Sequence, residues 1–218
     1  MDSFPGSPRL LKSGLVLLDP DNGSVQRVIA LQYNPDTLSR TLQAQTVGEG
    51  ADRSQVLRLK GPPVETIKVE AEIDATDQLE FPEQNKTAVQ EGIRPQLAAL
   101  ETILYPDSAR LQANDALSAA GTLEIIPMPG PLVLFVWSRN CVVPVMLKDF
   151  GVVEEAFDAN LNPIRAKVTL GLRVLSVNDL DFGSRGGSIF MVYQQQKERL
   201  RRLAPPTTLN TLGIGGLP

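Results

Sequence analysis

The stretch Pro129–Val174 decides the fold, and it reads PGPLVLFVWSRNCVVPVMLKDFGVVEEAFDANLNPIRAKVTLGLRV. An apolar run ending in Trp137 comes first and predicts a buried strand, and two further strand-like runs follow it. The turn sequence from Phe157 to Ala166 then leads into a long strand that alternates between apolar and polar residues. Alternation of this kind buries one face of a strand and exposes the other. The stretch therefore favours a protein that builds surfaces.

Composition excludes several kinds of chemistry. The 218 residues contain no histidine, which removes Ser-His-Asp and Cys-His mechanisms and histidine-ligated zinc. Cys141 is the only cysteine, so an internal disulfide and a cysteine-only metal site are impossible. The formal net charge of −4 gives no whole-chain reason to expect nucleic-acid binding. We therefore expect a non-enzymatic protein with no catalytic residues, no cofactor and no metal.

The N-terminal sequence, MDSFPGSPRLLKSGLVLLDPDNG, does not follow the pattern of a secretory signal peptide. Its apolar core is only GLVLL, and an acidic residue stands at position 2. No stretch approaches the roughly 20 apolar residues of a membrane span. We expect synthesis and assembly in the cytoplasm without a signal peptide, and no direct membrane insertion.

Turn signals divide the rest of the main domain into short strands. The Asn22-Gly23 pair predicts a hairpin, because both residues tolerate positive φ. Leu38 and Leu42 are expected to face inward from a weaker strand. The strands are predicted at 14–19, 25–33, 37–46, 55–59, 64–75 and 123–127, with a clear apolar and charged alternation in 64–75.

One helix is predicted in the main domain. Ile93, Leu97, Leu100 and Leu104 recur at helical spacing, so we expect a helix over 92–105 that ends at Pro106. The segment 109–122 is expected to be a connector, with a short helix as the alternative. The whole pattern predicts a mainly β fold, an antiparallel barrel or sandwich of about eight or nine strands with one packed helix.

The character of the sequence changes after residue 181. The GSRGG segment at 183–187 predicts a hinge, because it lacks both the P-loop ending and the dinucleotide-binding pattern. A helix is expected over 189–203, with a strongly basic end, followed by a flexible tail. We therefore expect a tube-like domain at 10–181 and a C-terminal extension at 182–218. Its candidate interface residues are Lys197, Arg199, Leu200, Arg201, Arg202 and Leu203, and no aromatic platform beside them favours nucleic acid.

Two groups of carboxylates could in principle act in catalysis or in cation binding. Glu154, Glu155 and Asp158 could form the acid pair of a glycoside hydrolase, but neighbours on a strand point to opposite faces. The acidic segment 64–91 contains no calcium-loop pattern, so a solvated face is the simpler interpretation. Neither group predicts an active site.

Several marks, in this order, resemble those of a known family. They are Tyr33-Asn34-Pro35 with Leu38, the run Ile73-Asp74-Ala75-Thr76-Asp77, the strand Pro131–Trp137, and the run from Phe157 to Val168. Together they resemble the tube-domain and baseplate hub-adaptor proteins of contractile injection systems, which are phage-tail-like particles. The resemblance covers roughly residues 10 to 180. The extension lacks the Gly-Asp-Thr-Leu signature of the LysM module that many relatives carry.

The resemblance implies a tail-tube fold and a place in a ring. It implies an adaptor that joins the spike hub to the inner tube, in a ring of copies that is expected to be six-fold. Partners would be further copies, the spike or hub protein, the inner-tube protein and other baseplate subunits, in a particle that is released or retained. Arg165, Lys167 and Arg173 would then face the lumen or a neighbour. The alternatives are the repeating inner-tube subunit and, from another class, a ligand- or carbohydrate-binding β-domain.

Overall fold

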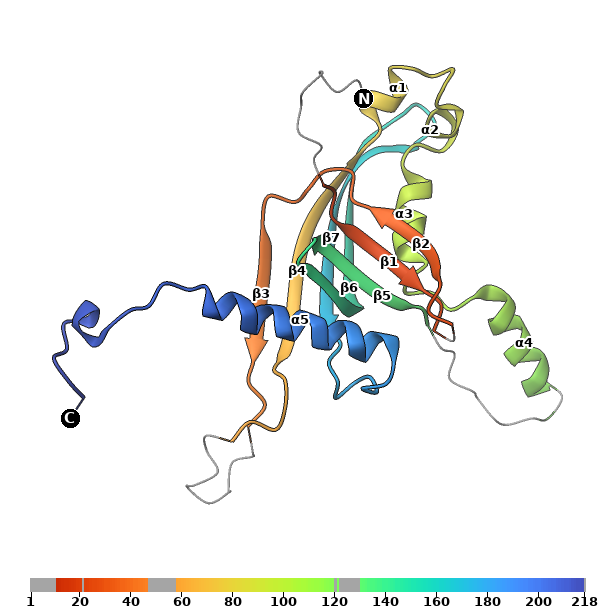
Figure 1. The fold of residues 1–218 in the computed structure, drawn as a ribbon. Helices are drawn as coiled ribbons and strands as arrows, with labels where there is room; N and C mark the ends of the chain where they lie inside the picture. Colours follow the sequence, from red (N-terminus) through yellow and green to blue (C-terminus); the bar gives the residue numbers. More distant parts are fainter. Residues whose placement is uncertain (1–10, 21, 47–57, 120, 122–129, 218) are drawn as a thin grey trace.

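Seven strands form one antiparallel sheet in the order β2-β1-β5-β6-β7-β4-β3 (Figure 1). The computed structural model describes residues 11–20, 22–46, 58–119, 121 and 130–217. The strands are β1 (Gly14–Leu18), β2 (Val25–Ala30), β3 (Leu38–Gln43), β4 (Val64–Asp74), β5 (Leu132–Ser138), β6 (Cys141–Phe157) and β7 (Pro163–Val174). The prediction of a mainly β fold with a packed helix is confirmed.

The helices lie around this sheet. They are α1 (Thr76–Leu79), α2 (Lys86–Glu91), α3 (Arg94–Glu101), α4 (Ser108–Ala119), α5 (Arg185–Arg202) and a 3-10 turn at Leu209–Leu212. α3 and α5 contribute side chains to the hydrophobic core, whereas α4 buries none and projects from the body (Figure 1). The short helices α1 and α2 lie beside the β6–β7 hairpin at one end of the sheet.

The predicted alternation in β4 and β7 builds the centre of the core. Ile67 pairs with Leu172, and Val69 pairs with Leu170, so their side chains share one face. All four are buried, and burying an aliphatic side chain of this size contributes about 1.5–3 kcal/mol. α3 closes part of this face with Leu97, which the 3.6-residue period directs inward.

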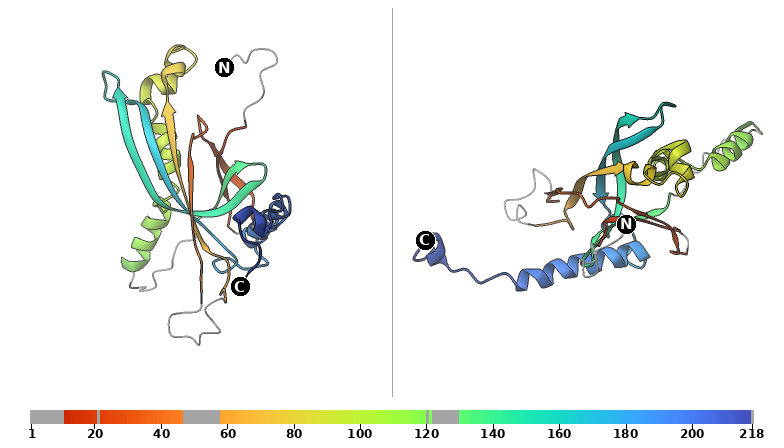
Figure 2. Two further views of the ribbon diagram at one scale, coloured as in Figure 1. Left: turned by 90° about the vertical axis from the view of Figure 1, so that its left-hand side faces the viewer. Right: turned by 90° about the horizontal axis from the view of Figure 1, so that it is seen from above.

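β6 is one strand of 17 residues, and not the two runs expected from the sequence. Its first part pairs with β5 up to Val145, and from Val145 onward it pairs with β7. A register shift between Leu147 and Asp149 lets the strand bend without ending, as β-bulges do. β6 therefore connects the part of the sheet formed by β2, β1 and β5 to the part formed by β7, β4 and β3, and the whole sheet is strongly twisted (Figure 2).

The β6–β7 turn is held by Asp158. Its carboxylate accepts hydrogen bonds from the backbone N–H groups of Asn160 and Asn162, and from the Asn162 side chain. These bonds hold the pKa of Asp158 below its ordinary value. Asn162 also donates to the Gln90 carbonyl oxygen of α2 at 2.9 Å. The hairpin tip is thereby fixed to the helical end of the molecule.

Several local expectations were wrong at their edges. Leu42 is 51% exposed, because β3 is the last strand of the sheet and has no neighbour beyond it among the described residues. The helix over 92–105 is shorter, Arg94–Glu101, and Leu104 is exposed. In the segment 109–122 the alternative of a helix is the one observed, as α4 (Ser108–Ala119). The structure names seven strands among the described residues, and the strands expected at 55–59 and 123–127 fall mostly or wholly outside them.

Candidate functional site

The three basic residues predicted on β7 lie on the outer face of the sheet, and each has a partner in the same chain. Arg165 Nε lies 2.7 Å from Asp74 Oδ2, and Lys167 Nζ lies 3.2 Å from Glu155 Oε1. Arg173 forms an ion pair with Asp179. Contacts made by this face would therefore have to engage charges that are already paired.

The Arg165–Asp74 pair joins β7 to the end of β4 on that face. Burial opposes ionisation of Asp74, but hydrogen bonds from Thr76 and Arg165 outweigh it and hold its pKa below the ordinary value. The same pairing raises the pKa of Arg165. Both groups therefore stay charged near neutral pH, and this part of the outer face of the sheet carries an ion pair.

A buried carboxylate joins α5 to the sheet. Glu65 stands at an inward position of β4, and its side chain is only 3% exposed. It accepts hydrogen bonds from Arg40 Nε at 2.8 Å, from the Tyr193 hydroxyl at 2.8 Å and from Lys197 Nζ at 2.8 Å. Lys197 also lies over the Tyr193 ring, 4.0 Å from its centroid. We call these four residues the Glu65 cluster.

The Glu65 cluster sets the charge states of its members. Burial opposes ionisation of Glu65, but the bonds from Lys197, Arg40 and Tyr193 lower its pKa below the ordinary value. Burial and the adjacent carboxylate raise the pKa of Tyr193, so the phenol remains a donor. The cluster is an ion-paired clamp: the charge of Glu65 is paired with those of Arg40 and Lys197 within the chain.

The GSRGG segment is the start of α5 and does not form the expected hinge. The Ser184 hydroxyl accepts a hydrogen bond from the Gly187 N–H at 3.0 Å, which is an N-cap. Gly186 and Gly187 are buried, and a Cβ on Gly187 would lie 2.2 Å from the Asp181 carbonyl oxygen. These glycines serve close packing between the helix and the preceding turn.

The predicted docking residues of α5 divide into two groups. Lys197 belongs to the Glu65 cluster, so it is not a free cation. Arg199, Arg201 and Arg202 are exposed and form no ion pair within the described part of the chain. Leu200 and Leu203, also predicted, are 50% and 73% exposed. No other described residue covers the exposed part of their apolar surface.

The chain beyond the clamp extends away from the body. We call residues 198–217 the arm, and every one of them is exposed. Figures 1 and 2 both place its end far from the sheet. The Pro205-Pro206 pair stiffens an extended backbone, and the 3-10 turn at Leu209–Leu212 gives the end a local shape. Its large apolar side chains are Leu200, Leu203, Leu209, Leu212, Ile214 and Leu217.

The sheet also has two edge strands that no further strand of the described residues pairs with. β2 and β3 end the strand order, and almost all of their residues are exposed. Val25 and Val28 on β2 are 58% and 64% exposed. Edge strands present unpaired backbone N–H and C=O groups, which pair readily with another strand. Both edges are therefore available for contacts between chains.

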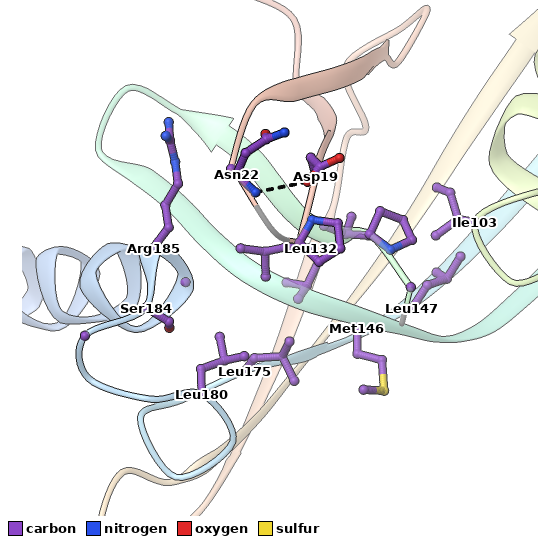
Figure 3. Close-up of a pocket in the computed structure, with 18 residues that line it drawn as sticks. Asp19, Asn22, Ile103, Leu132, Met146, Leu147, Leu175, Leu180, Ser184 and Arg185 are labelled. Carbon is purple, nitrogen blue, oxygen red and sulfur yellow. Dashed lines mark hydrogen bonds between the residues drawn. The ribbon is translucent and has the colours of Figure 1, made fainter. Parts of the chain in front are cut away.

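The pocket in Figure 3 has a volume of about 650 Å³ and lies where β5, β6 and the start of α5 approach each other. Leu132, Leu147 and Leu180 give it largely apolar walls. Its described lining holds one carboxylate, Asp19, which accepts a hydrogen bond from the Asn22 N–H at 3.0 Å. A lone carboxylate does not form the acid pair that glycoside hydrolysis requires.

The other carboxylates considered from the sequence do not converge. The Asp158 carboxylate accepts hydrogen bonds from the backbone of its own turn, and Glu155 is paired with Lys167. Glu154 is adjacent to Glu155 on β6. Within the described residues, no group of three acidic or cysteine side chains is arranged to hold a metal ion. Cys141 is half-buried, and burial raises the pKa of its thiol.

Sequence reasoning missed the Glu65 cluster. The available signal was a charged residue at an inward position of the alternating strand 64–75, two residues before Ile67. Its partners come from β3 and α5, and no local pattern identifies them. The clamp follows only from the way the chain folds.

No helix among the described residues is long and apolar enough to cross a membrane. A comparison with models of protein families finds none that matches the chain, and a comparison with curated proteins finds no match either.

Proposed function

We propose that this protein is a non-enzymatic structural component of a contractile injection system, an adaptor that joins the spike hub to the inner tube. The observation that carries the proposal is the pair of edge strands, β2 and β3, at opposite ends of one strand order. A ring of copies would cover such edges, which otherwise favour uncontrolled aggregation. The proposal also explains a surface-building fold with a projecting arm.

The marks that resemble the family are structural in this chain. Asn34 accepts a hydrogen bond from the Ser13 N–H and donates to the Leu11 carbonyl oxygen, so it fixes the first hairpin. Asp74 accepts from the Thr76 N–H at the end of β4, and Asp158 orders the β6–β7 turn. Proteins that share a tube-like fold would keep the residues that fix the turns and strand ends of the sheet. The structural roles of these marks therefore support the proposal.

The arm favours the adaptor over the repeating inner-tube subunit, which is the second candidate. An adaptor contacts unlike neighbours at its two ends, and the arm offers a contact surface that the sheet does not need for its own core. A subunit that only repeats along a tube has less use for such an extension.

The test is negative-stain electron microscopy of the material that co-purifies with a tagged copy from the native host. Sheathed particles with the tag at one end are expected for the adaptor. A tag along the whole inner tube would identify the repeating subunit. Free protein with no particle in any growth phase would contradict both, and the pocket of Figure 3 would then be the first place to seek a ligand.

A further inference from the structure

The molecule carries two surfaces of opposite charge that its own fold keeps apart. One is the arm, which begins with the sequence Glu198–Arg202. The other is the segment 76–91, which contains α1, α2 and their connection and which we call the cap. Figure 1 places the cap at one end of the sheet and the arm beyond β3, so the two do not meet within one chain.

The cap is acidic, and its charges have no ion-pair partners among the described residues. Its four acids are Asp77, Glu80, Glu83 and Glu91, against the single base Lys86. None of these carboxylates takes part in a salt bridge of the described chain. A solvated acidic face of this kind is common, so charge alone would not identify a contact.

Exposed apolar side chains make the cap more than a solvated face. Phe81 is 55% exposed and lies between Glu80 and Glu83, and Val89 is 42% exposed, two residues before Glu91. Leu161 at the adjoining hairpin tip is 72% exposed. The cap therefore combines apolar anchors with a carboxylate rim, which is the usual arrangement of a protein-binding surface.

The arm has the complementary arrangement. Arg199, Arg201 and Arg202 are exposed and unpaired within the described chain, and Leu200 and Leu203 lie among them. Lys197 is held by Glu65, so the clamp fixes α5 while the three arginines point into solvent. Guanidinium groups are suited to bidentate contacts with carboxylates.

We propose that the arm of one copy docks on the cap of a second copy through these opposite charges and apolar side chains. The contact joins two different surfaces, so it is of the heterologous type, which gives a ring where the rotation between copies closes and an open stack where it does not. It rests on the proposed function in that it names surfaces which join the copies. The charge of each surface disfavours the like pairings, arm with arm and cap with cap.

Charge exchange in the full-length protein tests the contact. One variant carries Arg199→Glu, Arg201→Glu and Arg202→Glu, and a second carries Glu80→Lys, Glu83→Lys and Glu91→Lys. Sedimentation velocity should show that each variant alone associates at least about tenfold more weakly than the wild type. An equimolar mixture of the two variants should recover association, because each then finds an oppositely charged partner.

A matched control changes the same net charge elsewhere. Lys12→Glu, Arg110→Glu and Arg139→Glu alter three exposed bases that lie outside both edge strands and form no ion pair in the described chain, and association should stay as in the wild type. Raising the salt from about 20 mM to about 500 mM should weaken the wild-type contact. Unchanged thermal unfolding of all variants is expected, since every altered side chain is exposed.

Three results would overturn the proposal: a wild-type protein that stays monomeric, an arm variant that associates like the wild type, or a mixture that does not recover. If the arm variant associates like the wild type, assembly through the sheet edges is still compatible with the data, so the proposed function would survive. Recovery in the mixture, without any particle in the host, would support the contact and contradict the proposed function.

Discussion

Lys197 donates a hydrogen bond to Glu65 across 132 residues of sequence, with Nζ 2.8 Å from Oε2. The pair connects β4 in the first half of the chain to α5 near its end. Arg40 of β3 reaches the other oxygen of the same carboxylate, so one buried group joins two strands and a helix. The polar contacts that hold α5 on the sheet therefore meet at one side chain, beside the core packing of Phe190 and Tyr193.

Glu65→Ala should destabilise the protein by about 1–3 kcal/mol, because the buried Tyr193 hydroxyl and two cations lose their acceptor. The cations are partly exposed and can turn toward water, which limits the loss. Urea unfolding measures the change. Glu70→Ala on the outer face of the same strand is the control, and it should stay within about 0.5 kcal/mol. Equal effects would mean that the clamp does not stabilise the fold.

Stability should fall in acid because Glu65 and Asp74 both have lowered pKa values in the folded state. Their contribution is complete above the ordinary carboxyl values of 4.5 and 3.8, and it is lost as the pH falls through the folded values. Urea unfolding from about pH 7 to about pH 3 gives the profile. Glu65→Gln should flatten part of it, and an unchanged slope would contradict the assignment.

Gly92→Ala should cost about 1–3 kcal/mol, since residue 92 has a φ of 60° and an added Cβ would lie 2.1 Å from the Pro163 carbonyl oxygen. The Ile93 N–H donates to that same oxygen at 2.9 Å, so the backbone cannot easily move away. Thermal unfolding measures the loss. Gly183→Ala, where no atom lies within 4 Å of the added Cβ, should leave stability unchanged.

Val28→Lys should weaken ring assembly about tenfold while leaving the single chain folded, because a lysine on an edge strand opposes pairing with another strand. The measurement is the amount of variant recovered in particles from the native host. Leu111→Lys on α4 is the control, at an exposed apolar residue away from either edge. Equal recovery of the two variants would show that β2 is not a subunit contact.

The parts of the fold that the sequence predicts well are those with a local period. The alternation in 64–75 and 164–174 appears as β4 and β7 with the expected buried faces. The sequence predicts two strand-like runs after Trp137, and Pro144, Asp149 and Gly151 interrupt the apolar pattern there. In the folded chain, pairing with β5 on one side and β7 on the other carries one strand through these positions.

The remaining misses are contacts between distant segments. The sequence GSRGG predicts a hinge, but in the folded chain Gly186 packs against Leu132 and Leu180 and the segment is the start of α5. Lys197 is predicted as an interface residue of the extension 182–218, yet it forms an ion pair with Glu65. Neither contact leaves a trace in the spacing of neighbouring residues, so both needed the three-dimensional structure.

The path of β7 has a mechanical consequence. The strand begins at Pro163, beside the cap, and ends at Val174, from which a short connection reaches α5 and the arm. Tension applied between a neighbour on the cap and a neighbour on the arm would pass from the cap into the backbone of β4, which leads directly into it, and across the β4–β7 pairs into β7. Eleven residue pairs with β6 on one side and nine with β4 on the other brace that backbone against bending. The sheet would then transmit a pull with little stretching, and the Glu65 cluster would be the first non-covalent link to bear the load.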